Sequence, residues 1–250
     1  MILRRITEHV KAQNWFAVAL DFLIVVVGVF VGLQVSNWNE NLAEKDLEKR
    51  YATYLHEEIN GNIEYFTDRT IKYEESQNTL IGYYDYLTGS RNQPPADEEL
   101  RGVLCKFGIN RYGSTNSSVY DELVSSGRLS LIGHWTAREA LNDFREKLAG
   151  SNASMAVADT PLQRGYQKLD RFLIRKTNLT ENAADSCILQ YTLLEGDASA
   201  AAVIAEIQTL ELVYLINFKR LLDSAVSTRE ALQDGYPHIQ AGQDMAETDQ

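Results

Sequence analysis

The chain has little of several residue types on which particular classes of protein depend. It holds 4 prolines, 4 histidines and 2 cysteines among 250 residues. So few prolines leave long stretches without a helix breaker, which favours long helices. Basic residues are outnumbered, with 24 Lys and Arg against 35 Asp and Glu and a net charge of −11. That balance argues against nucleic-acid binding, because a phosphate polyanion requires a basic face on its partner.

Catalytic motifs are also missing. No G-x-S-x-G elbow, Walker loop or dinucleotide fingerprint occurs in the sequence. His56-Glu57-Glu58 lacks the H-E-x-x-H spacing, and we expect it on a solvated helix face. The adjacent acids Glu74 and Glu75 do not face each other, so by themselves they make no acid–base pair. The sequence therefore predicts a protein that is not an enzyme and that has neither a metal site nor a cofactor.

One long hydrophobic run lies near the N-terminus. Residues 15–35 comprise 21 positions, of which 14 are Val, Ile, Leu or Phe. A helix of this length measures about 31 Å, enough to cross the roughly 30 Å hydrocarbon core of a bilayer. Trp15 and Trp38 lie 23 residues apart, as expected for aromatic anchors at the two interfaces. The sequence predicts a single transmembrane helix at residues 15–36.

Two other interpretations of this run compete with a retained span. A buried core helix is one, because the part without a charge covers only residues 22–33, and a cleaved signal peptide is the other. Apolar residues surround the whole helix, however, which suits lipid better than a single packed face. The A-x-A tripeptide at residues 17–19 precedes the apolar run, whereas a signal peptidase site follows such a run. A retained span is favoured.

The charges beside the run indicate its orientation. Arg4, Arg5 and Lys11 precede it, whereas the other flank mixes acidic and basic residues. The positive-inside rule then gives a cytoplasmic arm at residues 1–14, with the remainder facing outward. Residues 37–234 form one extracytoplasmic helical-bundle domain, for which a hydrophobic content of 44% can supply a core. The polar residues 235–250 are expected to form a disordered tail.

We expect an all-α fold in which the transmembrane helix continues into a long helix at residues 37–87 and packs in an elongated antiparallel bundle. The apolar seam of this helix follows the heptad spacing of coiled coils. With two polar interruptions, its members are Ile59, Ile63, Phe66, Thr70, Tyr73, Gln77, Leu80, Tyr84 and Leu87. The partner helices belong either to this chain or to a second copy, and packing within the chain is the favoured interpretation.

Further helices are expected at residues 97–106, 118–126 and 198–233. Gly127 follows the second of these at the usual position of a left-handed cap. Thr136 and Glu139 resemble a capping box that opens another long helix, which either continues toward Thr177 or breaks near Pro161. The stretch 178–197 has no regular pattern.

The two cysteines are Cys105 and Cys187. In an oxidising exterior this pair favours a disulfide that closes a loop of about 80 residues and stabilises the fold by about 2–5 kcal/mol. Two buried free thiols are the alternative, and the sequence leaves both open.

Polar and small residues form a stripe on one face of the transmembrane helix. At 100° per residue, Asp21, Gly28, Gly32 and Ser36 fall on that face. The G-x-x-x-G pair permits close helix approach, which predicts a membrane-helix interface; glycines tolerated in lipid, with Asp21 directed to the headgroups, are the alternative. A further motif at the outer interface is either a membrane anchor or a docking site. It consists of Gln34, Asn37, Trp38, Asn39 and Glu40.

The segment VVVGVFVGLQVSNWNE is similar to the signature of a family of uncharacterised bacterial single-span membrane proteins, whose members have roughly IVIGILIALQINNWNE. The matching residues are Gly28, Leu33, Gln34, Asn37, Trp38, Asn39 and Glu40. The segment YDELVSSGRLSLI at residues 120–132 resembles the family's short helix, small-residue turn and Leu-rich stretch. Gly32 and Ser36 depart mildly from the signature, where alanine and asparagine are more usual. The resemblance implies a bacterial inner-membrane protein with a periplasmic helical domain, and it implies no activity.

These observations favour a membrane-anchored interaction or scaffold protein. It would present its outer helical domain to a protein partner, or associate with a second copy through the transmembrane helix, while in contact with the lipid bilayer. The alternative is a sensor-like bundle that binds a small ligand between its helices and signals through a partner. An enzyme is a third and weaker hypothesis, because no cluster of titratable groups is evident.

Overall fold

The computed structural model describes residues 15–105, 115, 117–175 and 187–239, and the fold is all-α as predicted. The predicted arm at residues 1–14 lies outside the described residues. The helices are α2 (Trp15–Leu87), α3 (Asp97–Leu104), α4 (Ser118–Ser125), α5 (Trp135–Leu169), α6 (Tyr191–Glu195) and α7 (Ala200–Gly235), with 3₁₀ turns at Leu129–Leu131 and Asp170–Phe172. Two short strands, β1 (Leu173–Arg175) and β2 (Cys187–Leu189), complete the elements.

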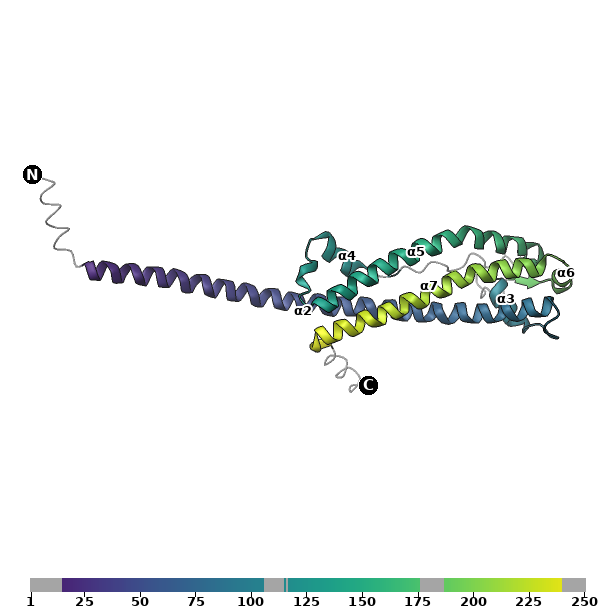
Figure 1. Ribbon diagram of the computed structural model, residues 1–250, viewed down its shortest axis with the longest axis horizontal. Coiled ribbons are helices and arrows are strands. Elements are labelled where there is room, and N and C mark those ends of the chain that lie inside the picture. Colours follow the sequence, from purple (N-terminus) through teal and green to yellow (C-terminus); the bar gives the residue numbers. More distant parts are fainter. Residues whose placement is uncertain (1–14, 106–114, 116, 176–186, 240–250) are drawn as a thin grey trace, which may run out of the picture. The chain divides into compact units, whose positions relative to one another are not determined.

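The chain divides into two compact units, Met1–Arg50 and Tyr51–Gln250. The described part of the first unit is the N-terminal portion of α2. The second unit is a helical bundle built from the rest of α2 together with α5 and α7, which lie side by side in Figure 1. In this bundle α7 runs antiparallel to both α2 and α5. The prediction of a long helix that ends at Leu87 is confirmed.

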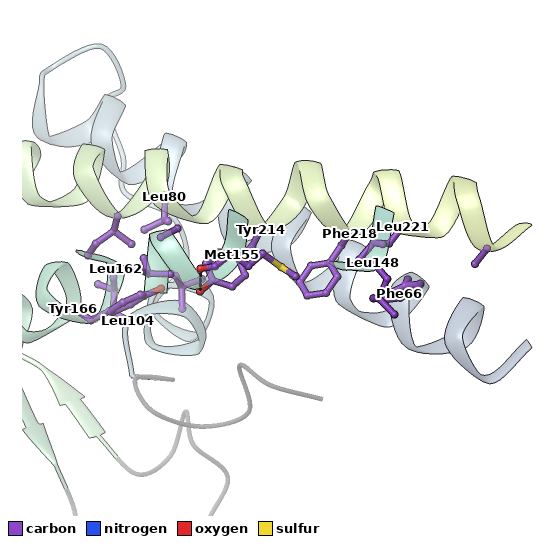
Figure 2. Close-up of a cluster of buried hydrophobic side chains, with 14 of the residues drawn as sticks. Phe66, Leu80, Leu104, Leu148, Met155, Leu162, Tyr166, Tyr214, Phe218 and Leu221 are labelled. Atoms are coloured by element: carbon purple, nitrogen blue, oxygen red, sulfur yellow. Dashed lines mark hydrogen bonds between the residues drawn. The ribbon is translucent and has the colours of Figure 1, made fainter. Parts of the chain in front are cut away.

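The heptad seam of α2 packs inside its own chain. Phe66 lies 6.4 Å from Phe218 of α7 between ring centroids, and Tyr73 stacks on Tyr214 of α7 at 5.4 Å. Phe66 also meets Phe144 of α5 at 6.3 Å. Figure 2 shows side chains from all three helices filling one core. The interpretation of packing within the chain is therefore confirmed.

Helix α5 starts before its predicted capping box and follows the continuous alternative at its other end. It begins at Trp135, so Thr136 lies inside the first turn and its hydroxyl is 3.0 Å from Nδ1 of His134, without a capping bond. The expected capping box is therefore wrong. Pro161 does not break the helix, which ends at Leu169. Burial of Ala158 and Leu162 on either side of the proline holds this turn against the core.

A glycine sets the contact between α5 and α7. A Cβ atom at Gly165 would lie 2.9 Å from Cγ1 of Ile207, closer than side chains allow. The absence of that atom brings the two helices together near the end of the bundle where α7 begins. Gly127 has φ +69°, the left-handed conformation predicted for the residue after α4.

The bundle extends beyond the boundary predicted at residue 234. Helix α7 continues to Gly235, and the following residues Tyr236 and Ile239 are only 6% and 5% exposed. The hydroxyl of Tyr236 accepts a hydrogen bond from the backbone N–H of His134. Residues 235–239 therefore belong to the packed domain, while 240–250 of the expected tail lie outside the described residues.

A disulfide and a small sheet close the end of the bundle at α3 and α6. Cys105 and Cys187 are bonded to each other, with their Cα atoms 6.0 Å apart, and both residues are almost fully buried. Strand β2 carries Cys187 and pairs antiparallel with β1. The bridge thus joins the end of α3 to the strand that precedes α6.

Candidate functional site

The N-terminal part of α2 presents an apolar surface that none of the other described residues covers. Its Val, Leu, Ile and Phe side chains between Leu20 and Val35 are 44–70% exposed. None of the residues in its most apolar 18-residue window is buried. Soluble monomers rarely expose apolar patches larger than a few hundred Å². An uncovered apolar surface of this size is typical of a segment that contacts lipid or another protein.

Two described helices are long and apolar enough to cross a membrane, namely α2 and α7. The two helices differ in burial. In the most apolar 18-residue stretch of α7, 44% is buried, whereas in that of α2 nothing is buried. The inner face of α7 contributes Ile207, Tyr214 and Leu221 to the bundle core, so this apolar face is packed within the domain, whereas Leu212 and Ile216 on the same helix are exposed. The N-terminal part of α2 has no comparable buried face among the described residues.

The predicted stripe lies on the exposed N-terminal part of α2. Asp21, Gly28, Gly32 and Ser36 are all exposed, and no atom comes within 4 Å of a Cβ placed on either glycine. The hydroxyl of Ser36 donates a 3.4 Å hydrogen bond to Glu40 one turn later. The backbone at the two glycines is thus open to another helix. Their role as an interface stays a prediction.

The outer-interface motif also lies on free helix surface. The side chains of Gln34, Asn37, Trp38, Asn39 and Glu40 are all exposed, and Trp38 reaches 66% exposure. An indole exposed to this extent suits the boundary between lipid and water, where its ring is apolar and its N–H is hydrated. None of these residues is engaged in the core.

A buried carboxylate joins the three long helices of the bundle. Glu211 of α7 is 5% exposed and accepts hydrogen bonds from Tyr166 of α5 and, at 2.5 Å, from Ser76 of α2. The next residue of α2, Gln77, donates at 2.8 Å to the backbone carbonyl of Gln208, which lies one turn before Glu211 on α7. The hydroxyl of Thr70, one of the two polar interruptions in the α2 seam, is buried without a hydrogen-bond partner among the described residues. Gln77 of α2 and Glu211 of α7, in contrast, interrupt their apolar seams and form bonds between helices. Sequence spacing could not reveal them, because the partners are 45 and 135 residues from Glu211.

The expectation that His56-Glu57-Glu58 lies on a solvated face is wrong for two of its three residues. Glu58 is 6% exposed and accepts a 2.7 Å hydrogen bond from the backbone N–H of Val119. Its carboxylate thus binds the first turn of α4, where backbone N–H groups lack partners within the helix. Burial raises the pKa of Glu58 above its usual value, and the hydrogen bonds at α4 oppose that shift. Through this contact Glu58 holds α4 against α2, and α4 is part of the segment that resembles the second family motif.

His56 of α2 is 4% exposed and lies against the end of α7. Its Nε2 is 3.3 Å from the side-chain amide nitrogen of Gln233, and its Nδ1 is 3.3 Å from that of Asn60. Burial lowers the pKa of His56, the positive charge of Arg229 lowers it further, and Glu57 partly opposes both effects. This histidine is a structural contact of the bundle. No group of three or more potential metal ligands occurs among the described residues.

Comparisons of the chain with protein-family models, with curated proteins and with solved structures find no match. The resemblance of residues 25–40 and 120–132 to the single-span family therefore stays a prediction. The function has to be argued from the residues and their geometry.

We expect acid to weaken the bundle partly through His56. Its pKa is lower in the folded state than its ordinary value of 6.5, so the unfolded chain binds more protons as the pH falls through that value. The free energy of unfolding should therefore decline below about pH 6.5 and level off once the pH is below the folded-state pKa. Thermal unfolding of the full chain in neutral detergent, followed at about pH 7.5 and 5.5, measures this change.

The matched variant is His56→Asn, which keeps a hydrogen-bonding side chain but does not titrate. It should lose less stability than the wild type over the same pH interval. Carboxylates that titrate, including Glu58, are common to both proteins and cancel in the comparison. An unchanged pH dependence in the variant would show that another group is responsible.

Proposed function

We propose that this chain is a membrane-anchored interaction protein of the bacterial inner membrane, which presents its helical bundle in the periplasm to a protein partner. The single observation that carries the proposal is the uncovered apolar surface of α2, where the Val, Leu, Ile and Phe side chains between Leu20 and Val35 are 44–70% exposed. A second support is that the described residues between Ala52 and Ile239 build one hydrophobic core without it.

Insertion in a bilayer is favourable on balance for this segment. Fourteen Val, Ile, Leu and Phe residues contribute together about −6 kcal/mol on the scale of helix insertion. Asp21 costs about 2.5–3.5 kcal/mol at the bilayer centre and less near one end of the span. The apolar contribution is the larger one, so lipid is the environment that suits the exposed surface.

The proposed orientation rests on two independent features. Arg4, Arg5 and Lys11 place the N-terminus on the cytoplasmic side by the positive-inside rule. The disulfide between Cys105 and Cys187 supports a bundle in an oxidising compartment, since cytosolic thiols are kept reduced. Alkylation of thiols in acid-quenched cells tests this orientation, because a cytoplasmic bundle would yield two free thiols.

The proposed interaction uses the stripe within the membrane. Gly28 and Gly32 offer backbone surface with nothing placed against it, and Asp21 lies on the same face. In lipid, close packing at small residues and a hydrogen bond from a polar side chain drive helix association, because apolar side chains gain nothing from leaving lipid. The partner is a transmembrane helix of a second copy or of another protein.

Two arginines placed in the apolar segment should release the chain from membranes. We expect Val27→Arg with Val31→Arg to move the protein from the carbonate-resistant membrane fraction to the soluble fraction, because each arginine costs about 2.5–3.5 kcal/mol near the bilayer centre. The measurement is fractionation followed by immunoblotting.

The control for this experiment replaces two exposed apolar residues of the bundle, Leu212→Arg with Ile216→Arg, which are 42% and 49% exposed. The control protein should remain in the membrane fraction. Retention of the Val27 and Val31 variant in carbonate-washed membranes would contradict the proposed anchor.

Filling the glycine stripe should weaken association within the membrane. We expect Gly28→Ile with Gly32→Ile to reduce energy transfer between labelled chains in bilayers at least severalfold, since the added side chains separate the helices. Val26→Ile with Phe30→Ile on the opposite face is the control and should leave the transfer unchanged. Equal transfer in all three proteins would exclude the stripe as the contact surface between copies.

A further inference from the structure

A short segment closes the end of the bundle at which α7 ends. It comprises residues 233–239, the last residues of α7 and the turn after them, and is called the closing segment here. Its side chains Tyr236 and Ile239 are only 6% and 5% exposed. The backbone N–H of Tyr236 donates to Leu232 at 2.9 Å, and that of Ile239 donates to Tyr236 at 3.0 Å. The segment is thus folded onto the bundle by few apolar side chains.

His134 and His238 hold the closing segment against α5 and α2. The ring of His134, the residue before α5, lies so close to Gly235 that a Cβ atom there would be 2.6 Å from Cγ of the histidine. Nε2 of His238, within the segment, lies 3.4 Å from the hydroxyl oxygen of Thr53 on α2. His134 is half-buried and His238 is exposed, so water reaches both rings and a proton can bind either one without moving the segment.

His56 differs from these two histidines because it is buried where the closing segment begins. It is 4% exposed, and its Nε2 lies 3.3 Å from the side-chain nitrogen of Gln233. On its own helix its Nδ1 lies 3.3 Å from the side-chain nitrogen of Asn60. The charged groups that act on it are Arg229 of α7, which opposes a second positive charge, and Glu57 of α2, which partly compensates. A proton on His56 would therefore be shielded from water and placed beside a cation.

Proton binding by His56 is for this reason coupled to opening of the segment. Burial, and then the charge of Arg229, lower the pKa of His56 in the closed form. In the open form water solvates the imidazole, and the pKa returns toward its ordinary value of 6.5. The open form then binds the proton more tightly, so its population rises as the pH falls through that value and levels off below the closed-form pKa. A difference of one pKa unit makes opening about tenfold more favourable.

We propose that the closing segment is released from the bundle in acid, with His56 as the residue that takes up the proton. At neutral pH the segment covers His56 and packs Tyr236 and Ile239 against the bundle. In acid it detaches, while the middle of α7 stays folded because its buried side chains, among them Tyr214 and Leu221, belong to the main core. Release exposes apolar surface that is covered at neutral pH. This device is independent of the proposed membrane interaction.

Hydrogen–deuterium exchange of the full chain in neutral detergent, at about pH 7.5 and 5.5, measures the opening. Exchange rates are divided by the intrinsic rate of each amide at the same pH to give protection factors. We expect the amides of Tyr236 and Ile239 to lose protection at least about tenfold at the lower pH, whereas residues 210–221 change less than about twofold. An equal change in both stretches, or no change in either, would overturn the proposal.

Two neutral replacements of the sensing residue, His56→Asn and His56→Gln, test the assignment. Each places an amide that does not titrate beside Gln233, so the segment should stay closed at both pH values. His238→Asn is the matched control, because it removes an exposed histidine from the segment itself, and it should keep the tenfold change. The proposal fails if both His56 variants keep the change, or if the control loses it. A segment already open at pH 7.5 in both variants would also overturn it, because closure would then depend on the imidazole and not on its charge.

Discussion

The organisation of this protein depends on one helix that is stabilised in two different ways along its length. From Ala19 to Lys49 the side chains of α2 are exposed apart from two half-buried residues, and from Tyr51 onward one face of the same helix is buried against α5 and α7. The heptad seam supplies that second face, with Phe66 and Leu80 fully buried. In the first segment the apolar residues surround the helix, so they can be satisfied only by a surrounding medium. In the second they lie on one side, so they can be satisfied by neighbouring helices.

Polar residues then determine how the bundle is assembled. An apolar core tolerates several helix registers, whereas a buried carboxylate loses its hydrogen bonds if the helices slide. Glu211 has partners on α2 and α5, and Glu58 binds the first turn of α4. These contacts lie near opposite ends of the buried part of α2. We infer that they select one arrangement from those that the seam alone would allow.

Much of the fold follows from sequence periodicity, and the reasons for the misses are physical. The long helices were predictable, because a seam that repeats over many turns is a strong signal. The strands β1 and β2 were not, since three residues each carry no usable pattern. His56 and Glu58 were assigned to solvent because charged neighbours dominate their local sequence, and only α4 and α7 bury them. The capping-box prediction for Thr136 failed because the helix starts at Trp135, two residues before the start that a cap at Thr136 would give.

Hydrogen exchange of the full chain in lipid nanodiscs, measured with increasing urea, tests most directly whether α2 has two independent sources of stability. The account predicts that the amides of residues 51–87 lose protection together with those of α5 and α7, at one urea concentration, while residues 19–36 remain protected by the bilayer. Loss of protection in residues 19–36 at the same concentration as the bundle would contradict it. Protection of residues 51–87 that persists after α5 and α7 have exchanged would also contradict it.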